Sequence, residues 1–382
     1  MRSLAIIVVL LSATGSAFAY PHFQRTSGTV RCSQCHIAPA GGGLLTQWGQ
    51  EEGADTLAGG GDGHFLHGAV TLPEWLSIGG DFRVAALAND VGSSEGTELA
   101  AFPMQADIGV AIRSGAWSVV GLIGGRGRVR SGAPSSPTST ASEIEDPSLA
   151  SYLISREHYV MWRPEESGVE GPYVRAGRFA SPYGLRLADH TAYIRRYLGY
   201  NLLEETYGVG GGWMNESSEV HATAFVYDPL LGAARKELGA AVMFETQPGE
   251  KLVIGASARA GVANTTRLQA GVHAKLWLEG SKLLLQGEAN GVREMFDGPG
   301  DRWQLATYFG PVLIPMRGLS VGIAHQAFAE DLQTRSVLRQ GLDAWASYLP
   351  IAHVEIMATG RAQRIGPHER AFVAMLQLHY YL

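Results

Sequence analysis

The stretch AFVAMLQLHYYL, from Ala371 to Leu382, ends the chain and shows most clearly how it folds. Its side chains alternate between two faces, which is the period-two pattern of a β-strand lying between two different environments. One face is almost wholly apolar, and it carries Phe372, Ala374, Leu376, Leu378, Tyr380 and Leu382. The other face turns polar toward the end, and it carries Val373, Met375, Gln377, His379 and Tyr381. The stretch therefore predicts a strand that separates an apolar from a polar environment.

The same alternation recurs from Glu74 onward. In EWLSIGGDFRVAAL, Asp81 and Arg83 lie opposite a face of large apolar side chains, and in WSVVGLIGGRGRVR the arginines at 126, 128 and 130 share one face. A charge at the midplane of a membrane barrel costs about 2–4 kcal/mol, so these arginines must face water or protein. About sixteen such segments can be counted. They span 74–88, 102–113, 117–130, 152–163, 172–181, 204–214, 219–227, 236–246, 252–261, 267–279, 281–294, 301–312, 318–330, 335–349, 352–362 and 369–382.

The connections between these segments differ in length in an alternating way. Short ones lie near 114–116, 215–218, 279–281 and 350–351, and long ones near 89–101, 131–150 and 183–203. Short turns at one end and long loops at the other are typical of an outer-membrane β-barrel. A soluble sandwich or propeller would instead have polar outward faces and no such asymmetry. We therefore predict an all-β fold, a barrel of about sixteen antiparallel strands over residues 74–382, with both termini on the periplasmic side.

The connection YGLRLADHTAYIRRYLGYN, which begins at Tyr183, is long, mixed in charge and partly helical in pattern. Two interpretations are open from the sequence. The connection is either an external loop that folds into the lumen and narrows it, or an ordinary surface loop.

The first nineteen residues have the features of a secretory signal peptide. Arg2 is a small positive region, Leu4 to Leu11 is an apolar run too short to span a bilayer, and Ala17-Phe18-Ala19 is an A-x-A cleavage site. We expect the mature chain to begin at Tyr20. The formal net charge of −6 argues against a nucleic-acid partner.

The chain's two cysteines lie in the sequence Cys32-Ser-Gln-Cys35-His36, within residues 20–73. The pattern C-x-x-C-H is the attachment signature of c-type haem, in which both thiols bind the haem covalently and the histidine ligates the iron. A thioredoxin-like pair would lie near a βαβ pattern, which is absent, and a zinc site would need further Cys or His ligands at a suitable spacing. We therefore predict one covalently attached haem c, with His36 as its metal ligand.

The second axial ligand of this haem stays open. The segment 20–73 contains no methionine but contains His22, His64 and His67. We expect a bis-histidine haem, with His64 or His67 favoured over His22. An exposed histidine without a ligand role is the competing interpretation for each of them.

Barely fifty residues precede the first strand, too few for an independent core. We therefore expect the haem segment to enter the barrel from the periplasmic side and plug it. Lumen arginines such as Arg83, Arg126, Arg128 and Arg178 could then pair with the haem propionates, because arginine binds carboxylates bidentately. The competing interpretation is that these arginines line a porin constriction.

The chain resembles the fused outer-membrane cytochrome–porins, a family that includes monohaem iron-oxidation proteins. The residues that carry the resemblance are Pro21, Phe23, Arg25, Cys32, Cys35, His36 and Pro39. The stretch AGGGLLTQWGQ differs from the family's Leu-Asn and Gly pattern, to which only Leu44 or Leu45 and Gly49 correspond, as in a related branch. The resemblance implies a porin-like barrel in outer-membrane lipid.

It also implies single-electron transfer between an extracellular redox partner, such as ferrous iron, and a periplasmic cytochrome or other carrier. A porin-like channel with a structural or sensory haem plug is the alternative. A haem enzyme is a third class, although Asp189-His190 is the nearest candidate for an acid–base pair and is weak.

Overall fold

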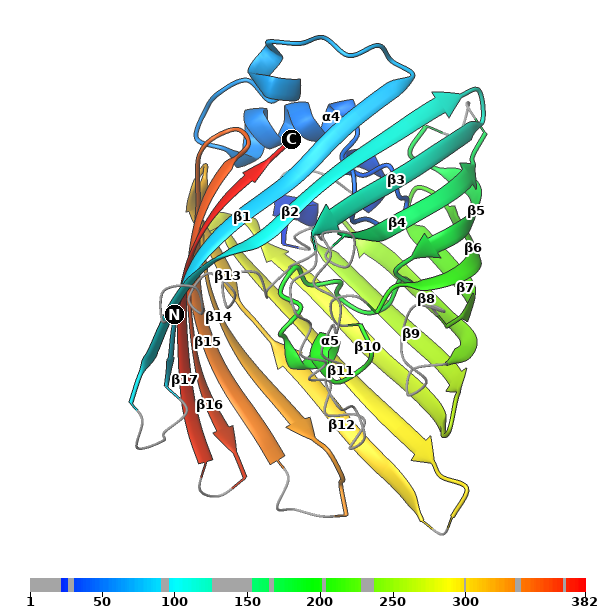
Figure 1. Ribbon diagram of the computed structural model, residues 1–382, viewed down its shortest axis with the longest axis vertical. Helices are drawn as coiled ribbons and strands as arrows, with labels where there is room; N and C mark the ends of the chain where they lie inside the picture. The colour runs from blue at the N-terminus through cyan, green and yellow to red at the C-terminus, as the bar shows by residue number, and fades with distance from the viewer. Residues whose placement is uncertain are drawn as a thin grey trace, which may run out of the picture.

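The computed structural model describes residues 22–26, 31–90, 96–125, 153–164, 168–200, 204–227, 237–298, 300–333, 338–366 and 369–382. Within these residues the strands form one antiparallel sheet in which nearly every strand pairs with its neighbours along the chain. The first strand, β1, also pairs with the last, β17, where Phe82 lies opposite Tyr380. This pairing closes the sheet into a barrel (Figure 1).

The strands agree closely with the alternating segments of the sequence. They are β1 (Leu76–Asp90), β2 (Glu98–Ser114), β3 (Trp117–Gly125), β4 (Leu153–Trp162), β5 (Gly171–Phe179), β6 (Thr206–Met214), β7 (Ser218–Val226), β8 (Leu238–Gly249), β9 (Leu252–Val262), β10 (Thr266–Leu278), β11 (Leu283–Met295), β12 (Asp301–Phe309), β13 (Val312–Met316), β14 (Leu319–Ala329), β15 (Leu338–Ile351), β16 (Val354–Ile365) and β17 (Glu369–Tyr381).

Two of these strands, β12 and β13, together fill a single position in the barrel. Both lie between β11 and β14, with Phe309 opposite Gly287 and Val312 opposite Leu284. Pro311 lies in the interruption, and because proline has no N–H it cannot donate a ladder hydrogen bond there. The closed barrel therefore has sixteen strand positions, which confirms the predicted fold class.

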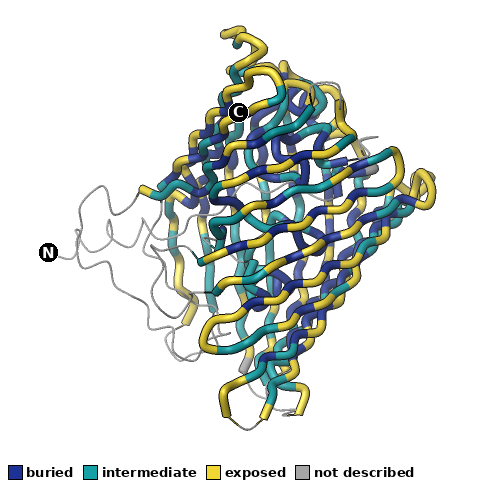
Figure 2. Tube along the Cα trace, turned by 90° about the vertical axis from the view of Figure 1, so that its right-hand side faces the viewer, coloured by how far each residue is buried: buried dark blue, intermediate teal, exposed yellow. Residues whose placement is uncertain are grey.

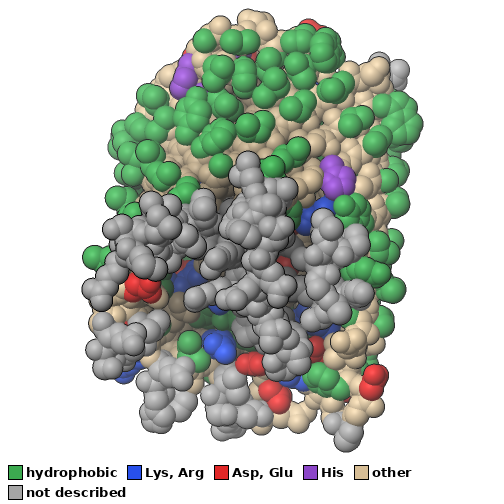
Figure 3. Space-filling view, viewed as in Figure 1, with side chains coloured by type: hydrophobic (Ala, Val, Ile, Leu, Met, Phe, Trp, Pro, Cys, Tyr) green, Lys and Arg blue, Asp and Glu red, His purple; other side chains and the backbone are tan. Residues whose placement is uncertain are grey.

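The two faces of the wall differ as the sequence predicts. Leu376 is 55% exposed on the outside, whereas the neighbouring Gln377 is 2% exposed, facing the lumen. Exposed and buried residues alternate along the strands (Figure 2), and apolar side chains gather over the upper part of the face in Figure 3. Many of the buried polar residues are charged. An apolar exterior around a polar lumen is what a strand barrel in lipid requires.

The two ends of the barrel also differ, although less regularly than expected. The connections β2–β3, β6–β7, β8–β9, β13–β14 and β15–β16 are tight turns at one end, here called the short-turn end. The opposite, long-loop end has the longest connections, but β9–β10 and β16–β17 are short there too. The chain enters β1 and leaves β17 at the short-turn end, as an even strand number requires.

Of the arginines expected in the lumen, Arg126 and Arg128 lie outside the described residues, as does the predicted signal peptide.

The described part of the connection between β5 and β6, residues 180–200 and 204–205, folds into the lumen, as one of its two interpretations predicted. Its short helix α5 (Tyr193–Arg196) lies inside the barrel in Figure 1. Leu185, Tyr193 and Leu198 are fully buried, and they pack with wall residues such as Phe328. We call residues 180–205 the internal loop.

The described residues of the N-terminal segment, 22–26 and 31–73, lie at the short-turn end beside the C-terminus (Figure 1). The segment contains the short helices α2 (Phe23–Thr26), α3 (Cys32–Cys35) and α4 (Gln47–Glu52), the π-helical turn η1 (Gly53–Leu57) and the 3₁₀ turn η2 (Phe65–Gly68). Ile37 and Leu44 pack against Tyr159 and Met161 of the wall. Within the described residues, no helix is long and apolar enough to cross a membrane.

Candidate haem-attachment site

The two cysteines lie on one helical turn. Helix α3 begins at Cys32 and ends at Cys35, so the thiols are three residues apart and neighbours on the same side of the turn. The backbone N–H of His36 donates to the carbonyl of Cys32 over 2.9 Å, and His36 itself is extended. The turn therefore brings both thiols and the histidine together in five residues, as the motif requires.

The glycines after the motif form the turn that folds the chain back on it. His36 pairs with Leu45 in an isolated bridge, and the N–H of Ile37 donates to the carbonyl of Leu44 over 3.0 Å. Between them, Gly41, Gly42 and Gly43 have φ angles of 85°, 84° and 63°. Only glycine adopts this left-handed region readily, so the stretch AGGGLL is a structural turn.

Helix α4 packs directly on the end of the motif. The hydroxyl of Thr46 caps α4 by accepting from the N–H of Gly49, and it donates to the carbonyl of Gln34 over 2.8 Å. A Cβ on Gly49 would lie 2.3 Å from the carbonyl oxygen of Cys35. The glycine therefore allows the close approach of the two helices.

Buried polar contacts tie the segment to lumen-facing residues of the wall. Arg31 donates to Glu219 over 3.4 Å and to the carbonyls of Asn215 and Ser218. The Gln24 amide donates to Glu245 over 3.0 Å, and Lys275 donates to Gln24. These contacts fix the start of the segment inside the barrel.

His36 is buried, and Cys32 and Cys35 are half-buried. Burial raises the pKa of the Cys32 thiol and raises that of Cys35 to about 12, so both free thiols are protonated at neutral pH. Reactive redox cysteines have lowered pKa values instead. Burial also lowers the pKa of His36 to about 4, which keeps its imidazole neutral, and its Nδ1 is buried without a hydrogen-bond partner.

These features fit haem c. A neutral imidazole with a buried, unpaired nitrogen is a suitable iron ligand, and paired thiols of low reactivity are not those of a redox catalyst. Among the described side chains, no group of three or more His, Cys, Asp or Glu residues is placed to hold a metal ion by itself. That finding gives no support to a zinc site built on Cys32 and Cys35.

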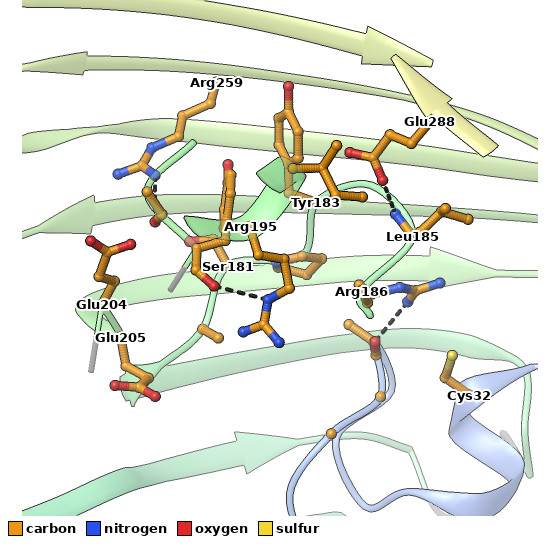
Figure 4. Close-up of a pocket in the computed structure, with 18 of the residues that line it drawn as sticks. Cys32, Ser181, Tyr183, Leu185, Arg186, Arg195, Glu204, Glu205, Arg259 and Glu288 are labelled. Carbon is orange, nitrogen blue, oxygen red and sulfur yellow. Dashed lines mark hydrogen bonds between the residues drawn. The ribbon is translucent and has the colours of Figure 1, made fainter. Parts of the chain in front are cut away.

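Two hollows flank the motif. An interior cavity of about 70 Å³ lies between the N-terminal segment and the internal loop, and Cys32, Tyr183, Arg186, Arg195 and Lys275 are among the residues that line it (Figure 4). A wider hollow at the short-turn end is lined by residues that include His36 and His64.

The comparisons with known proteins concern the barrel. No protein-family model matches the chain, and no curated protein matches it in sequence. Solved structures do match it. The barrel has the porin fold.

Three of these similar structures are outer-membrane proteins. The anion-selective porin from Comamonas acidovorans has a TM-score of 0.58 at 9% identity, covering 80% of this chain and 99% of its own. OmpT of Vibrio cholerae has a TM-score of 0.57 at 9% identity, covering 82% and 100%. The channel DcaP of Acinetobacter baumannii has a TM-score of 0.54 at 12% identity, covering 80% and 97%. Identities this low show the fold alone, which together with the apolar exterior supports a place in a bacterial outer membrane.

The three histidines considered as second ligands lie in different surroundings within this porin-fold barrel. His22 is buried against Phe23 and Trp345. The ring of His67 packs on that of His353, with 4.8 Å between centroids. His64 shares the wider hollow with His36, and its Nδ1 lies 2.7 Å from a carboxylate oxygen of Asp62. The choice among them stays a prediction.

Sequence reasoning also overlooked a methionine. The segment 20–73 contains no methionine, so a methionine ligand would have to come from a strand of the barrel. Met161 on β4 is buried and lines the same hollow as His36. A strand far from the motif cannot be recognised as its neighbour from sequence alone.

Two of the arginines expected to pair with the haem propionates already pair with other residues of the protein. Arg83 donates to Asp81 over 2.8 Å, and Arg178 donates to Glu205 over 3.3 Å and to two carbonyls. The cations that line the cavity beside Cys32 are Arg186, Arg195, Arg259 and Lys275. Two of these belong to the internal loop, whose path through the lumen the sequence left open.

The pair Asp189-His190 does not form an isolated acid–base dyad. The Asp189 carboxylate accepts from Arg361 over 2.7 Å and from Thr191. Its contacts anchor the internal loop to β16.

Proposed function

We propose that the chain is a monohaem c-type cytochrome joined to a porin-fold barrel in the outer membrane. In this proposal it carries single electrons between an extracellular donor or acceptor, such as ferrous iron, and a periplasmic carrier. The observation that carries the proposal is the fold of Cys32–Cys35 and His36: one half-buried turn at the short-turn end, followed by a buried histidine whose Nδ1 has no hydrogen-bond partner.

The residues have distinct roles. Each thiol of Cys32 and Cys35 would add across a haem vinyl group, so that a sulfur–carbon bond forms and the thiol proton passes to the other vinyl carbon. His36 would ligate the iron. When bound, haem c supplies a one-electron iron(II)/iron(III) couple.

The occupied lumen favours electron transfer over solute passage. The N-terminal segment is tied to the wall through Arg31 and Gln24, and the internal loop packs on the wall through Leu185, Tyr193 and Leu198. The N-terminal segment lies at the short-turn end, and helix α5 of the internal loop lies inside the barrel (Figure 1). A haem held between them would have protein on both sides, as a conduit requires.

Covalent attachment is the first test. The full chain is expressed in a bacterial host that matures c-type cytochromes, and outer-membrane protein is stained for haem after denaturing electrophoresis. We expect a haem-stained band for the wild type and for Ser33→Ala, a matched control in the same turn. We expect no stain for Cys32→Ala with Cys35→Ala. A wild-type chain without covalent haem would contradict the proposal.

Electron transfer is the second test. The purified protein is reconstituted into vesicles with entrapped cytochrome c, and an impermeant reductant is added outside. Reduction of the entrapped protein supports the conduit. Leakage of small anions without reduction would instead favour the porin-like channel, and a high-spin haem spectrum would favour an enzyme.

A further inference from the structure

Arg186 connects the internal loop to the haem-attachment segment. Its guanidinium donates to the carbonyl of Ala40 over 2.6 Å, four residues after His36 in the chain. Figure 4 shows this contact beside the Cys32 sulfur, at the floor of the interior cavity. Arg186 itself has a φ of 57°, a left-handed conformation that few residues other than glycine adopt. The loop is therefore bent at the residue that meets the segment.

Arg186 shares its carboxylate partners with two other cations. Its guanidinium lies 3.3 Å from Glu245 and 3.6 Å from Glu219. The same two carboxylates also pair with Lys275 and Arg31, over 3.2 Å and 3.4 Å. Three cations thus share these two carboxylates.

Two histidines of the wall complete the surroundings of the cluster. His221 Nε2 lies 3.5 Å from Glu219, and His273 Nε2 lies 3.1 Å from Glu245. Their side chains, like those of both glutamates and Lys275, are at most 1% exposed, and that of Arg186 is 13% exposed. Bulk solvent and salt therefore screen the charge of Arg186 only weakly.

The charge of Arg186 acts on the haem motif. Arg186 lines the interior cavity together with Cys32 and contacts the segment at Ala40, and its charge acts there against the opposite charges of Glu219 and Glu245. A buried cation beside a haem disfavours the iron(III) form, which carries one positive charge more than the iron(II) form.

We propose that Arg186 is a positioning residue that raises the reduction potential of the haem held by Cys32, Cys35 and His36, and that it locks the internal loop onto the haem segment. The inference rests on the proposed function. In this proposal the internal loop, which enters the barrel from the long-loop end, controls the reduction potential of the haem at the short-turn end.

Two variants distinguish an effect of the Arg186 charge from an effect of its side-chain geometry. Arg186→Gln removes the charge, whereas Arg186→Lys keeps it but loses the planar fork of donors. The matched control is Arg302→Gln, because Arg302 pairs with Glu294 and Glu330 on the wall. Each full-length protein is purified in detergent with its haem, and the reduction potential is measured by spectroelectrochemical titration.

We expect Arg186→Gln to shift the potential downward, and Arg186→Lys and Arg302→Gln to keep it close to the wild-type value. We also expect both Arg186 variants to lose protection of the N-terminal segment against protease. A wild-type potential in Arg186→Gln would overturn the proposal, as would equal shifts in the glutamine and lysine variants, since a purely structural role predicts the latter.

Haem staining of the same samples distinguishes the two proposals. If the wild type carries no covalent haem, the proposed function fails and the role of Arg186 fails with it. If the wild type and the variants carry haem but share one potential, only the role of Arg186 fails.

Discussion

Gly49 shows how closely single residues are packed around the haem motif. Gly49→Ala would place a Cβ 2.3 Å from the Cys35 carbonyl oxygen, which must push α4 away from the motif. Overpacking of this kind costs about 1–3 kcal/mol. We expect faster proteolysis of the N-terminal segment and a smaller haem-stained fraction. Gly60→Ala is the control, because nothing lies within 4 Å of its Cβ position. Equal behaviour of the two variants would contradict the packing described here.

The internal loop is an element whose position depends on buried apolar side chains. Leu198 is fully buried in the cluster that joins the loop to the wall. Leu198→Ala removes this packing, and a buried leucine truncated to alanine costs about 2–5 kcal/mol. We expect faster hydrogen exchange across residues 185–200, with the strands unchanged. Leu99→Ala, at a side chain 78% exposed on the outer wall, should leave the loop protected. Unchanged exchange in Leu198→Ala would show that the polar contacts alone hold the loop.

The same element should respond to acid through Asp189. Partial burial alone would raise the pKa of Asp189, whose side chain is 43% exposed, but the Arg361 guanidinium, the charge of His190 and hydrogen bonds from Thr191 outweigh it and lower this pKa to about 2. The free carboxyl titrates near pH 3.9, so its contribution to loop stability is complete above that pH and is lost as the pH falls toward 2. Hydrogen exchange of the loop, corrected for intrinsic rates, should accelerate over this range. In Asp189→Asn the acceleration should disappear, and its persistence would assign the acid response to another group.

At the scale of the whole molecule, the barrel could be predicted because its signal is local. Alternation places Arg83 inward and Val84 outward, and each strand repeats that information. The break at Pro311 moved the end of one predicted strand only slightly. The haem motif was also local. The contacts around the motif could not be predicted in this way, because they join residues far apart in the sequence. Gln24 and Glu245 are 221 residues apart, and Arg31 and Glu219 are 188 residues apart. No pattern in the sequence specifies such pairs.

The apolar exterior predicts how the whole barrel responds to a charge at different heights. Val272 lies at the middle of β10 and is 62% exposed on the outer wall, whereas Leu99 lies at the long-loop end of β2. An arginine facing lipid costs about 2–4 kcal/mol at the midplane and about 0–1 kcal/mol near the interface. We expect Val272→Arg to lower the urea midpoint of the barrel in lipid vesicles well below that of Leu99→Arg. In detergent micelles, where the hydrocarbon layer adapts to the charge, the two variants should converge. Equal midpoints in vesicles would mean that the middle of β10 does not lie in the hydrocarbon layer.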